Sequence, residues 1–339
     1  MAGHARPVTR NAPNHATALS PGIKSPYLSI VMFYRAIRFA AVATAAMTLI
    51  SMACSSASSH TEEVLAWRAE RLASLQSGDS WLALVGLYWL EEGDNPFGSN
   101  QALPVVMPAS HVPPSGGRFH LADGVVTFFA VPGLDVMWDG RPVDRMILRD
   151  DSAGDITVLT LGTLTFHVIK RAGELAVRVK DSASEALAGF EGLDYYPIDE
   201  KWRIMARYVA HSGGAMQMAV PTFQGPTQFL ESPGSLEFEI DGKPHSLAVF
   251  AEAGDDWLFV IFGDETNGRA TYGGGRFIYV PRADDNGRVD LDFNRAYSPP
   301  CVFTPFATCP LPPPQNRLAL KVEAGEKNYA QHLTDMGER

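Results

Sequence analysis

The sequence predicts a mainly β protein built from two packed, sandwich-like lobes with one N-terminal helix. Short segments of alternating apolar and polar residues recur along most of the chain, as in half-buried strands. Thirty glycines and 24 prolines are spread widely through 339 residues, which is typical of a turn-rich β protein. A 3.6-residue apolar period, typical of a helix, follows Thr61 near the N-terminus.

The composition limits the classes of partner. A hydrophobic content of 46% and a charged content of 19% are those of a globular chain, not of a disordered one. The formal net charge of −10 argues against binding to nucleic acid or to an anionic lipid surface. We therefore expect no nucleic-acid partner, and membrane contact only through an N-terminal lipid anchor.

The N-terminus carries the features of an export signal. Residues 1–31 show no hydrophobic period and are read as disordered or as following an over-early start codon. Residues 32–54 combine two arginines, an apolar run of about a dozen residues and small residues, as in a secretory signal peptide. Cys54 is a lipidation candidate because its position resembles the cleavage site of bacterial lipoproteins; plain signal cleavage is the alternative. We expect an exported protein on the periplasmic side of the cell envelope, lipid-anchored or soluble.

Residues 61–92 are predicted to form the N-terminal helix and an aromatic segment, which pack against the β-sandwich that follows them in the chain. Thr61 is a cap residue, and the acids that follow it suit the positive end of a helix dipole. Gly78 is expected to end the helix. The run from Trp81 to Leu90 is read as a core element, with a partner-docking surface as the alternative.

Residues 95–182 are predicted to form a β-sandwich. Leu164, Phe166 and Val168 alternate with polar residues, and further short strands are separated by turns such as Asp139-Gly140. The order of these pieces resembles a forkhead-associated domain. The residues that read phosphothreonine in that family are not in place here, so the resemblance implies a fold and no phosphopeptide activity.

Residues 183–327 are predicted to form a second β lobe, followed by a tail at 328–339. The continuously apolar run from Trp257 to Phe262 indicates a strand buried on both faces. Gly273-Gly274-Gly275 is not followed by the helix that a dinucleotide fold requires, so it is read as a bulge or a close backbone approach. The stretch 291–327 holds seven prolines among aromatic and charged residues and is expected to be ordered without being regular.

Several motifs occur in order in this second lobe: Thr271 to Phe277, Leu291 to Tyr297, Pro299-Pro300-Cys301, Phe303-Thr304-Pro305, Ala307 to Pro310 and Asn316-Arg317-Leu318. Together they resemble the bacterial family called domain of unknown function 1684. The resemblance runs from about Glu63 to Lys327, with departures at Ser298 and Phe306. It implies no established activity, so it suggests a family without suggesting a function.

A polar pocket is the main hypothesis for a functional site. Its candidate ligand-binding residues are Asp264, Asn267, Arg276, Asp292, Asn294, Arg295, Asn316 and Arg317. Arginine forks suit carboxylate or phosphate groups, so a small anionic molecule is the predicted partner. The alternative is structural: these side chains could instead satisfy backbone carbonyls of the proline-rich stretch. Arg178, Lys180 and Asp181 could belong to the same site or to an exposed face.

Cys301 and Cys309 are a disulfide candidate, because a disulfide is favoured in an exported protein. Inert thiols and half of a metal site are the alternatives. Two cysteines cannot fill a tetrahedral zinc site, and the histidines are scattered, so no metal and no cofactor are expected.

The function that best fits the sequence is a binding or scaffold module of the cell envelope. The alternative is a hydrolase that acts on an anionic small molecule through Asp292 or Asp264 with arginines stabilising charge. Nucleophile-elbow, phosphate-loop and zinc-protease motifs are missing from the sequence, so whether the protein is an enzyme stays open, as do its protein partners.

Overall fold

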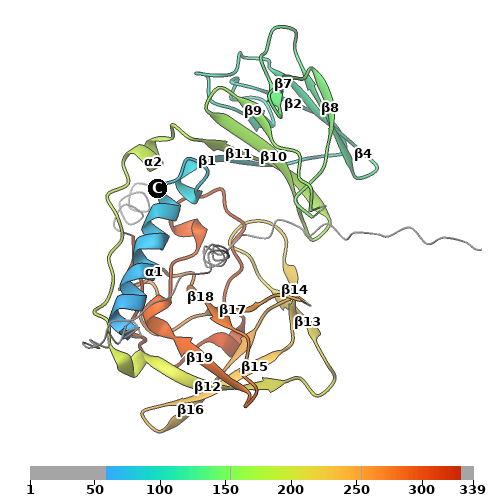
Figure 1. Cartoon of the computed structure of the whole chain (residues 1–339). Coiled ribbons are helices and arrows are strands. Elements are labelled where there is room, and N and C mark those ends of the chain that lie inside the picture. Colours follow the sequence, from blue (N-terminus) through green and yellow to red (C-terminus); the bar gives the residue numbers. More distant parts are fainter. Residues whose placement is uncertain (1–58, 153, 253, 330–339) are drawn as a thin grey trace, which may run out of the picture.

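The computed structural model describes residues 59–329 except 153 and 253. The predicted disordered segment, the signal peptide 32–54 with Cys54, and residues 330–339 lie outside the described residues. The described chain is mainly β and forms two lobes, which confirms the predicted fold class (Figure 1). Asn328 and Tyr329, placed in the tail by the sequence, are ordered with the second lobe, where Tyr329 packs into a buried cluster.

The first lobe is a sandwich of two sheets. One has the strand order β1-β11-β10-β9-β6-β7 and the other the order β3-β2-β4-β5-β8. Neighbouring strands are antiparallel except for β2 and β3. The strands are β1 (Leu84–Trp89), β2 (Gly93–Gly98), β3 (Val105–Val106), β4 (Gly117–Ala122), β5 (Val125–Ala130), β6 (Met137–Trp138), β7 (Arg141–Pro142), β8 (Arg145–Leu148), β9 (Leu159–Leu161), β10 (Leu164–Arg171) and β11 (Glu174–Asp181).

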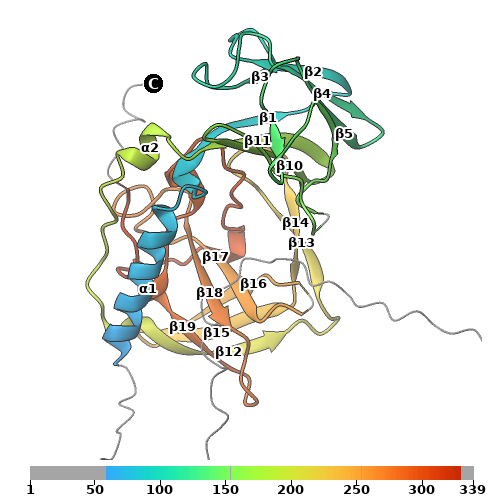
Figure 2. The same cartoon turned by 45° about the horizontal axis from the view of Figure 1, so that its top comes forward.

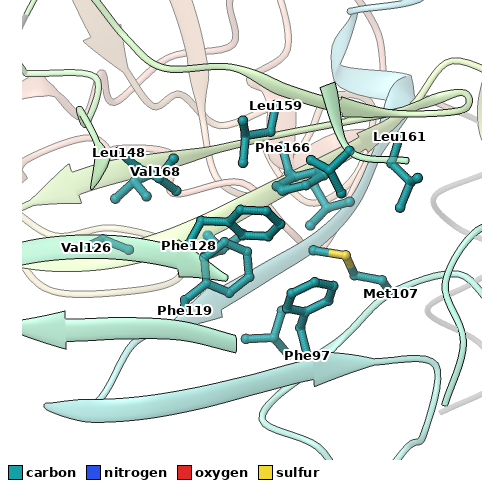
Figure 3. Packing of buried hydrophobic residues seen from close by; sticks show 14 of the residues in the cluster. Phe97, Met107, Phe119, Val126, Phe128, Leu148, Leu159, Leu161, Phe166 and Val168 are labelled. Atoms are coloured by element: carbon teal, nitrogen blue, oxygen red, sulfur yellow. The ribbon is translucent and has the colours of Figure 1, made fainter. Parts of the chain in front are cut away.

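Aromatic rings fill the space between these two sheets (Figure 3). Phe97, Phe119 and Phe128 come from one sheet and contact each other with ring centroids 5.3–5.6 Å apart. Phe166 of the opposite sheet meets them at 5.8–6.2 Å. The apolar residues of the pattern that predicted a half-buried strand thus face this core, and the polar residues between them lie on the outer face of β10.

The second lobe has three small sheets and two buried apolar clusters. Its strand orders are β16-β15-β12-β19, β13-β14 and β17-β18. β16 lies beside β17 and β18 beside β19, so these strands enclose a shared apolar cluster. The strands are β12 (Arg203–Ala210), β13 (Met216–Val220), β14 (Gln228–Ser232), β15 (Gly234–Ile240), β16 (Lys243–Val249), β17 (Trp257–Phe262), β18 (Arg276–Pro281) and β19 (Arg288–Asp292).

Helix α1 (His60–Leu75) lies against the second lobe (Figures 1 and 2). We expected it to begin at Thr61 and to pack on the sandwich; both expectations were wrong. The helix begins earlier because Ser59 caps it in a reciprocal capping box with Glu62. It docks on the second lobe because Leu75 packs in the same buried cluster as residues of the 301–309 stretch.

The chain crosses from α1 to the first lobe and then back. After α1, η2 (Trp81–Ala83) leads into β1, which pairs with β11, so the aromatic segment splits between the two lobes. Short helices mark the return and the final stretch: α2 (Glu185–Ala188), η3 (Glu200–Trp202), η4 (Phe293–Arg295), η5 (Pro300–Val302) and η6 (Pro314–Asn316). The first lobe is therefore inserted between two parts of the chain that pack together.

Candidate functional site

The candidate residues fall into two groups on the second lobe and not into one pocket. Asp264, Asn267 and Arg276 gather where β17 ends and β18 begins, and Arg317 lies beside Gly263 there. Asp292, Asn294 and Arg295 follow β19 at η4. The Asp292 side chain fixes the second group locally. Its Oδ1 accepts a hydrogen bond from the backbone N–H of Asn294 at 3.0 Å and so caps η4.

Arg276 and Asp264 form a fully buried ion pair. Nη2 of Arg276 donates to Oδ2 of Asp264 at 2.6 Å, and both side chains are 0% exposed. The guanidinium also donates to the backbone carbonyls of Val322 at 2.8 Å and of Ala324. Burial lowers the pKa of Arg276, although Asp264 opposes this shift. Arg276 thus holds the terminal stretch onto β18. This is the structural role that the sequence offered as the alternative to ligand binding.

Asp264 has no oxygen left for catalysis. Its Oδ2 also accepts from the backbone N–H of Val322 at 3.0 Å. Its Oδ1 accepts from the backbone N–H and the hydroxyl of Thr266, at 3.0 and 2.5 Å. These four bonds use the four acceptor positions of a carboxylate. Asn267 supports the same turn, since its Oδ1 accepts from the backbone N–H of Asp264 at 2.7 Å.

Two candidate asparagines also satisfy backbone groups. Asn316 exchanges two hydrogen bonds with the backbone of Ala248, at 2.7 and 2.8 Å, and donates to the carbonyl of Ile261 at 2.8 Å. Asn294 exchanges two bonds with the backbone of Asp199, at 3.0 and 2.9 Å. Both side chains are buried, so they join separate segments and are not presented to a ligand.

The glycine run before Arg276 is a close backbone approach, as predicted. Gly275 has a φ of +87°, and a Cβ added there would lie 2.3 Å from Cγ of Pro312 and 2.6 Å from the carbonyl oxygen of Phe262. Only glycine fits this position. It lets the proline-rich stretch lie directly on the end of β17.

Asp292 and Arg295 join a charged network with α1. Oδ2 of Asp292 lies 2.9 Å from Nε2 of His60 and 3.4 Å from Nε of Arg295. Nη2 of Arg295 donates to Oε2 of Glu63 at 3.2 Å. The sequence did not indicate His60 as a site residue, because an amphipathic period does not say what a helix packs against.

A cleft opens beside this network. It has a volume of about 140 Å³ and is lined by Glu63, Trp257, Ile278, Tyr279, Pro281, Asp290, Asp292 and Arg295. Trp257 and Tyr279 are 39% and 51% exposed. They lie on one face of the β17–β18 pair, where Tyr279 stacks on Phe259 with ring centroids 4.8 Å apart. The cleft therefore combines partly exposed aromatic rings with carboxylates and a guanidinium.

A second ion pair, which the sequence did not indicate, fixes α1 more firmly. Nε of Arg71 donates to Oε1 of Glu326 at 3.0 Å, and Oε2 of Glu326 accepts from the backbone N–H of Ser298 at 2.8 Å. Burial alone would lower the pKa of Arg71, but the charge and hydrogen bond of Glu326 outweigh it and raise the pKa. Nothing in the sequence paired a helix residue with one 255 positions later.

Cys301 and Cys309 are two buried free thiols in this structure. The Sγ of Cys309 accepts from the backbone N–H of Cys301 at 3.1 Å, so the two residues are in contact. Burial raises the pKa of the Cys309 thiol, and the hydrogen bond with Cys301 adds to this effect. A disulfide between them stays a prediction.

Within residues 59–329, no group of His, Cys, Asp and Glu side chains is arranged to hold a metal ion. No helix in the same part of the chain is long and apolar enough to cross a membrane.

The comparison with family models concerns the second lobe. Residues 188–327 match the model of a family described as a protein of unknown function (DUF1684). The chain belongs to this family. An uncharacterised protein of Haloarcula marismortui, solved by NMR in solution, is 34% identical to this chain. The match covers 41% of this chain and 78% of the other, with a TM-score of 0.36.

A further solved structure comes from a study of phosphothreonine-dependent forkhead-associated domain interactions. It is 17% identical, covers 28% of this chain and 92% of its own, and gives a TM-score of 0.20. No curated protein matches the chain. The family is thus established without an activity.

Proposed function

We propose that this protein is an exported binding module of the cell envelope, and that its ligand enters the cleft beside α1. The observation that carries the proposal is Arg295. It is a guanidinium of the family's C-terminal stretch that stays partly exposed, at 29%, beside the exposed rings of Trp257 and Tyr279. Arg276, in contrast, is entirely enclosed by the terminal stretch.

The size and charge of the cleft limit the ligand. Pockets for whole drug-sized molecules usually measure about 300–1,000 Å³, so about 140 Å³ admits only one end of a ligand. Glu63 and Asp292 share Arg295, while Asp290 is held by Arg203 through a bond of 2.7 Å. Three carboxylates thus face two arginines, so an added anion would meet a net negative charge. An uncharged, hydroxyl-rich group that stacks on the rings fits better than the anion expected from the sequence.

Binding is favoured over hydrolysis at these residues. Asp264 is fully hydrogen-bonded, as described above. Asp292 accepts two hydrogen bonds from Asn294 at one oxygen and contacts His60 and Arg295 with the other. A general base needs a free lone pair within reach of a proton, so neither carboxylate is placed for that role.

A thermal-shift screen against sugars, amines and carboxylates tests the proposal. We expect a hydroxyl-rich compound to raise the melting temperature of the native protein by mass action. The shift should disappear in Arg295→Ala and in Trp257→Ala. The second variant matters because Trp257 is 39% exposed and takes no part in the charged network that holds α1.

Arg288→Ala is the matched control, since Arg288 is 57% exposed and paired only at the surface with Asp284. It should keep the full shift. A shift that survives in both Arg295→Ala and Trp257→Ala would place the ligand elsewhere. If no compound raises the melting temperature and Arg295→Ala is only less stable, the role of Arg295 is to hold α1 in place.

A further inference from the structure

A second feature, far from the cleft in sequence, is a basic cluster on the outer face of the first lobe. Arg178 on β11 lies directly opposite His167 on β10, and Lys180 lies opposite Thr165. Residues two apart on a strand share a face, and directly opposed residues have Cβ atoms about 5 Å apart. Arg178, Lys180 and His167 therefore form one cluster. Asp181 belongs to the opposite face, where it accepts from Thr163 at 2.6 Å.

Arg178 lacks the partners that a buried arginine normally has. It is 6% exposed, and its side-chain Nε is buried without a hydrogen-bond partner. Its guanidinium forms no ion pair with any residue that the structure describes. Its guanidinium carbon lies 5.7 Å from the ring centroid of Trp81, which is a cation–π contact and not an acceptor. The ion pair of Arg276 shows what this fold provides when it buries an arginine for structural reasons. A buried charge without an acceptor is strongly unfavourable, so Arg178 needs another explanation.

The charged groups around Arg178 leave the cluster positive. Lys180 donates to the backbone carbonyl of Asp79, and Arg171, further along β10, is paired with Asp151 at 2.8 Å. Burial lowers the pKa of Arg178 to about 10, and Arg171 adds to this shift. Burial, together with Arg178 and Lys180, lowers the pKa of His167 to about 4. Burial is the main cause of both shifts; the neighbouring cations add to it, and Asp151 opposes them.

This cluster faces the second lobe. Phe306 packs on Leu87, Ile169 and Ala176 of the same sheet face, and the hydroxyl of Thr304 donates to the carbonyl of Leu84 at 3.3 Å. At the far end of the β10–β11 hairpin, an open crevice of about 450 Å³ lies against β14 and is lined by Lys170, Arg171, Ala172, Gln228 and Phe229. The basic face thus lies at the junction of the lobes, under the family's own 301–309 stretch.

We propose that Arg178, Lys180 and His167 form a binding site for a small oxyanion, a phosphate or carboxylate group, at the lobe junction. A guanidinium binds either group through two parallel hydrogen bonds. The oxyanion must be small, because so little of Arg178 is exposed. This site is separate from the cleft beside α1, and either can be present without the other.

The test compares melting temperatures in sodium phosphate, sodium acetate and sodium chloride at equal ionic strength. At about ten times its dissociation constant, a bound oxyanion should raise the melting temperature by roughly 3–5 °C relative to chloride. Arg178→Met should abolish this shift. Arg149→Met, which changes a 56% exposed arginine of the same lobe, should keep it. A response to phosphate but not to acetate would assign the site to phosphoryl groups, and the reverse would assign it to carboxylates.

A purely structural Arg178 gives a different result. In chloride, Arg178→Met should be as stable as the native protein or more stable, because it removes a buried charge without a partner. Destabilisation of Arg178→Met by the same amount in every salt would overturn the proposal, as would equal melting temperatures of the native protein in all three salts. If Arg178→Met does not fold, Lys180→Met takes its place and should weaken the shift.

A spectroscopic readout locates the anion. NMR titration of the His167 ring should show its pKa near 4 in chloride and a higher value in phosphate, because a bound anion favours the protonated ring. The charged groups that face this ring are Arg178, Lys180, Arg171 and Asp151. The other described histidines should not shift. An unchanged His167 pKa beside a phosphate-dependent melting temperature would place the anion elsewhere and refute the assignment.

Discussion

Arg276 shows how a residue type that suits ligands can serve the backbone instead. From the sequence, its fork pointed to carboxylate or phosphate recognition. In the structure the fork meets one carboxylate, Asp264, and the carbonyls of a stretch that runs past it at residues 322–324. Those carbonyls lie in an irregular segment, where no strand neighbour pairs with them. Arg276 takes the place of that missing neighbour.

Arg276→Met should therefore destabilise the protein without affecting ligand binding. The substitution leaves Asp264 buried without its charge partner and removes donors from two carbonyls, which typically costs about 3–5 kcal/mol of unfolding free energy. Denaturant unfolding measures the change. Arg288→Met, at an exposed position, should stay within about 0.5 kcal/mol of the native protein. Equal stability of the two variants would mean that Arg276 is not part of the scaffold.

The residue-scale predictions succeeded in choosing side chains and failed in assigning what they do. Asp264, Asn267 and Arg276 do come together, and so do Asp292 and Arg295. Their spacing in the sequence could not show that Asp264 and Arg276 would hydrogen-bond to the backbone of the terminal stretch. It also could not show that α1 would supply Glu63 to the second. Both outcomes depend on contacts between segments far apart in the chain.

At the scale of elements, α1 is joined to the second lobe chiefly through charge. Arg71 reaches Glu326, and Arg68 donates to the carbonyl of Tyr196 at 3.0 Å. The apolar contribution is smaller, with Val64 and Leu75 as the fully buried apolar residues of the helix. A helix held this way depends on its buried ion pair for position as well as for stability.

A double-mutant cycle on Arg71→Met and Glu326→Gln tests this dependence. Each single change leaves a buried polar group without its partner, so each should cost about 3 kcal/mol or more of unfolding free energy. The double variant should cost much less than their sum, with a coupling of about 1–3 kcal/mol. Denaturant unfolding, followed by tryptophan fluorescence, to which Trp67 near Tyr297 contributes, provides the measurement. The exposed Glu70→Gln serves as the control, and additive costs would contradict the pairing.

The elements themselves were largely readable from the sequence. Alternation located β10, and Asp139-Gly140 marked the turn between β6 and β7. The error lay in the partner of α1. An amphipathic period identifies the apolar face of a helix but not the surface that covers it, and a helix that precedes a lobe in sequence need not pack on that lobe.

At the scale of the whole molecule, the first lobe is an insertion whose basic face closes against the second lobe. His167 lies on that face, and burial, together with Arg178 and Lys180, lowers its pKa to about 4. In the unfolded chain the pKa returns to about 6.5. Between these two values the unfolded chain binds a proton that the folded chain does not, so stability falls as the pH drops from about 6.5 to about 4. Above pH 6.5 the effect is absent.

His167→Gln isolates this contribution from the many carboxylates that titrate in the same range. The difference in unfolding free energy between the native protein and the variant should be constant above pH 7. As the pH falls from 7 to 4, the native protein should lose up to about 3 kcal/mol of unfolding free energy relative to the variant. Denaturant unfolding at a series of pH values in chloride measures this difference. If the stabilities of the two proteins changed with pH in parallel, the His167 ring would not be buried beside the cations. In the Arg178→Met background the effect should shrink, because one of the charges that lower the His167 pKa is gone.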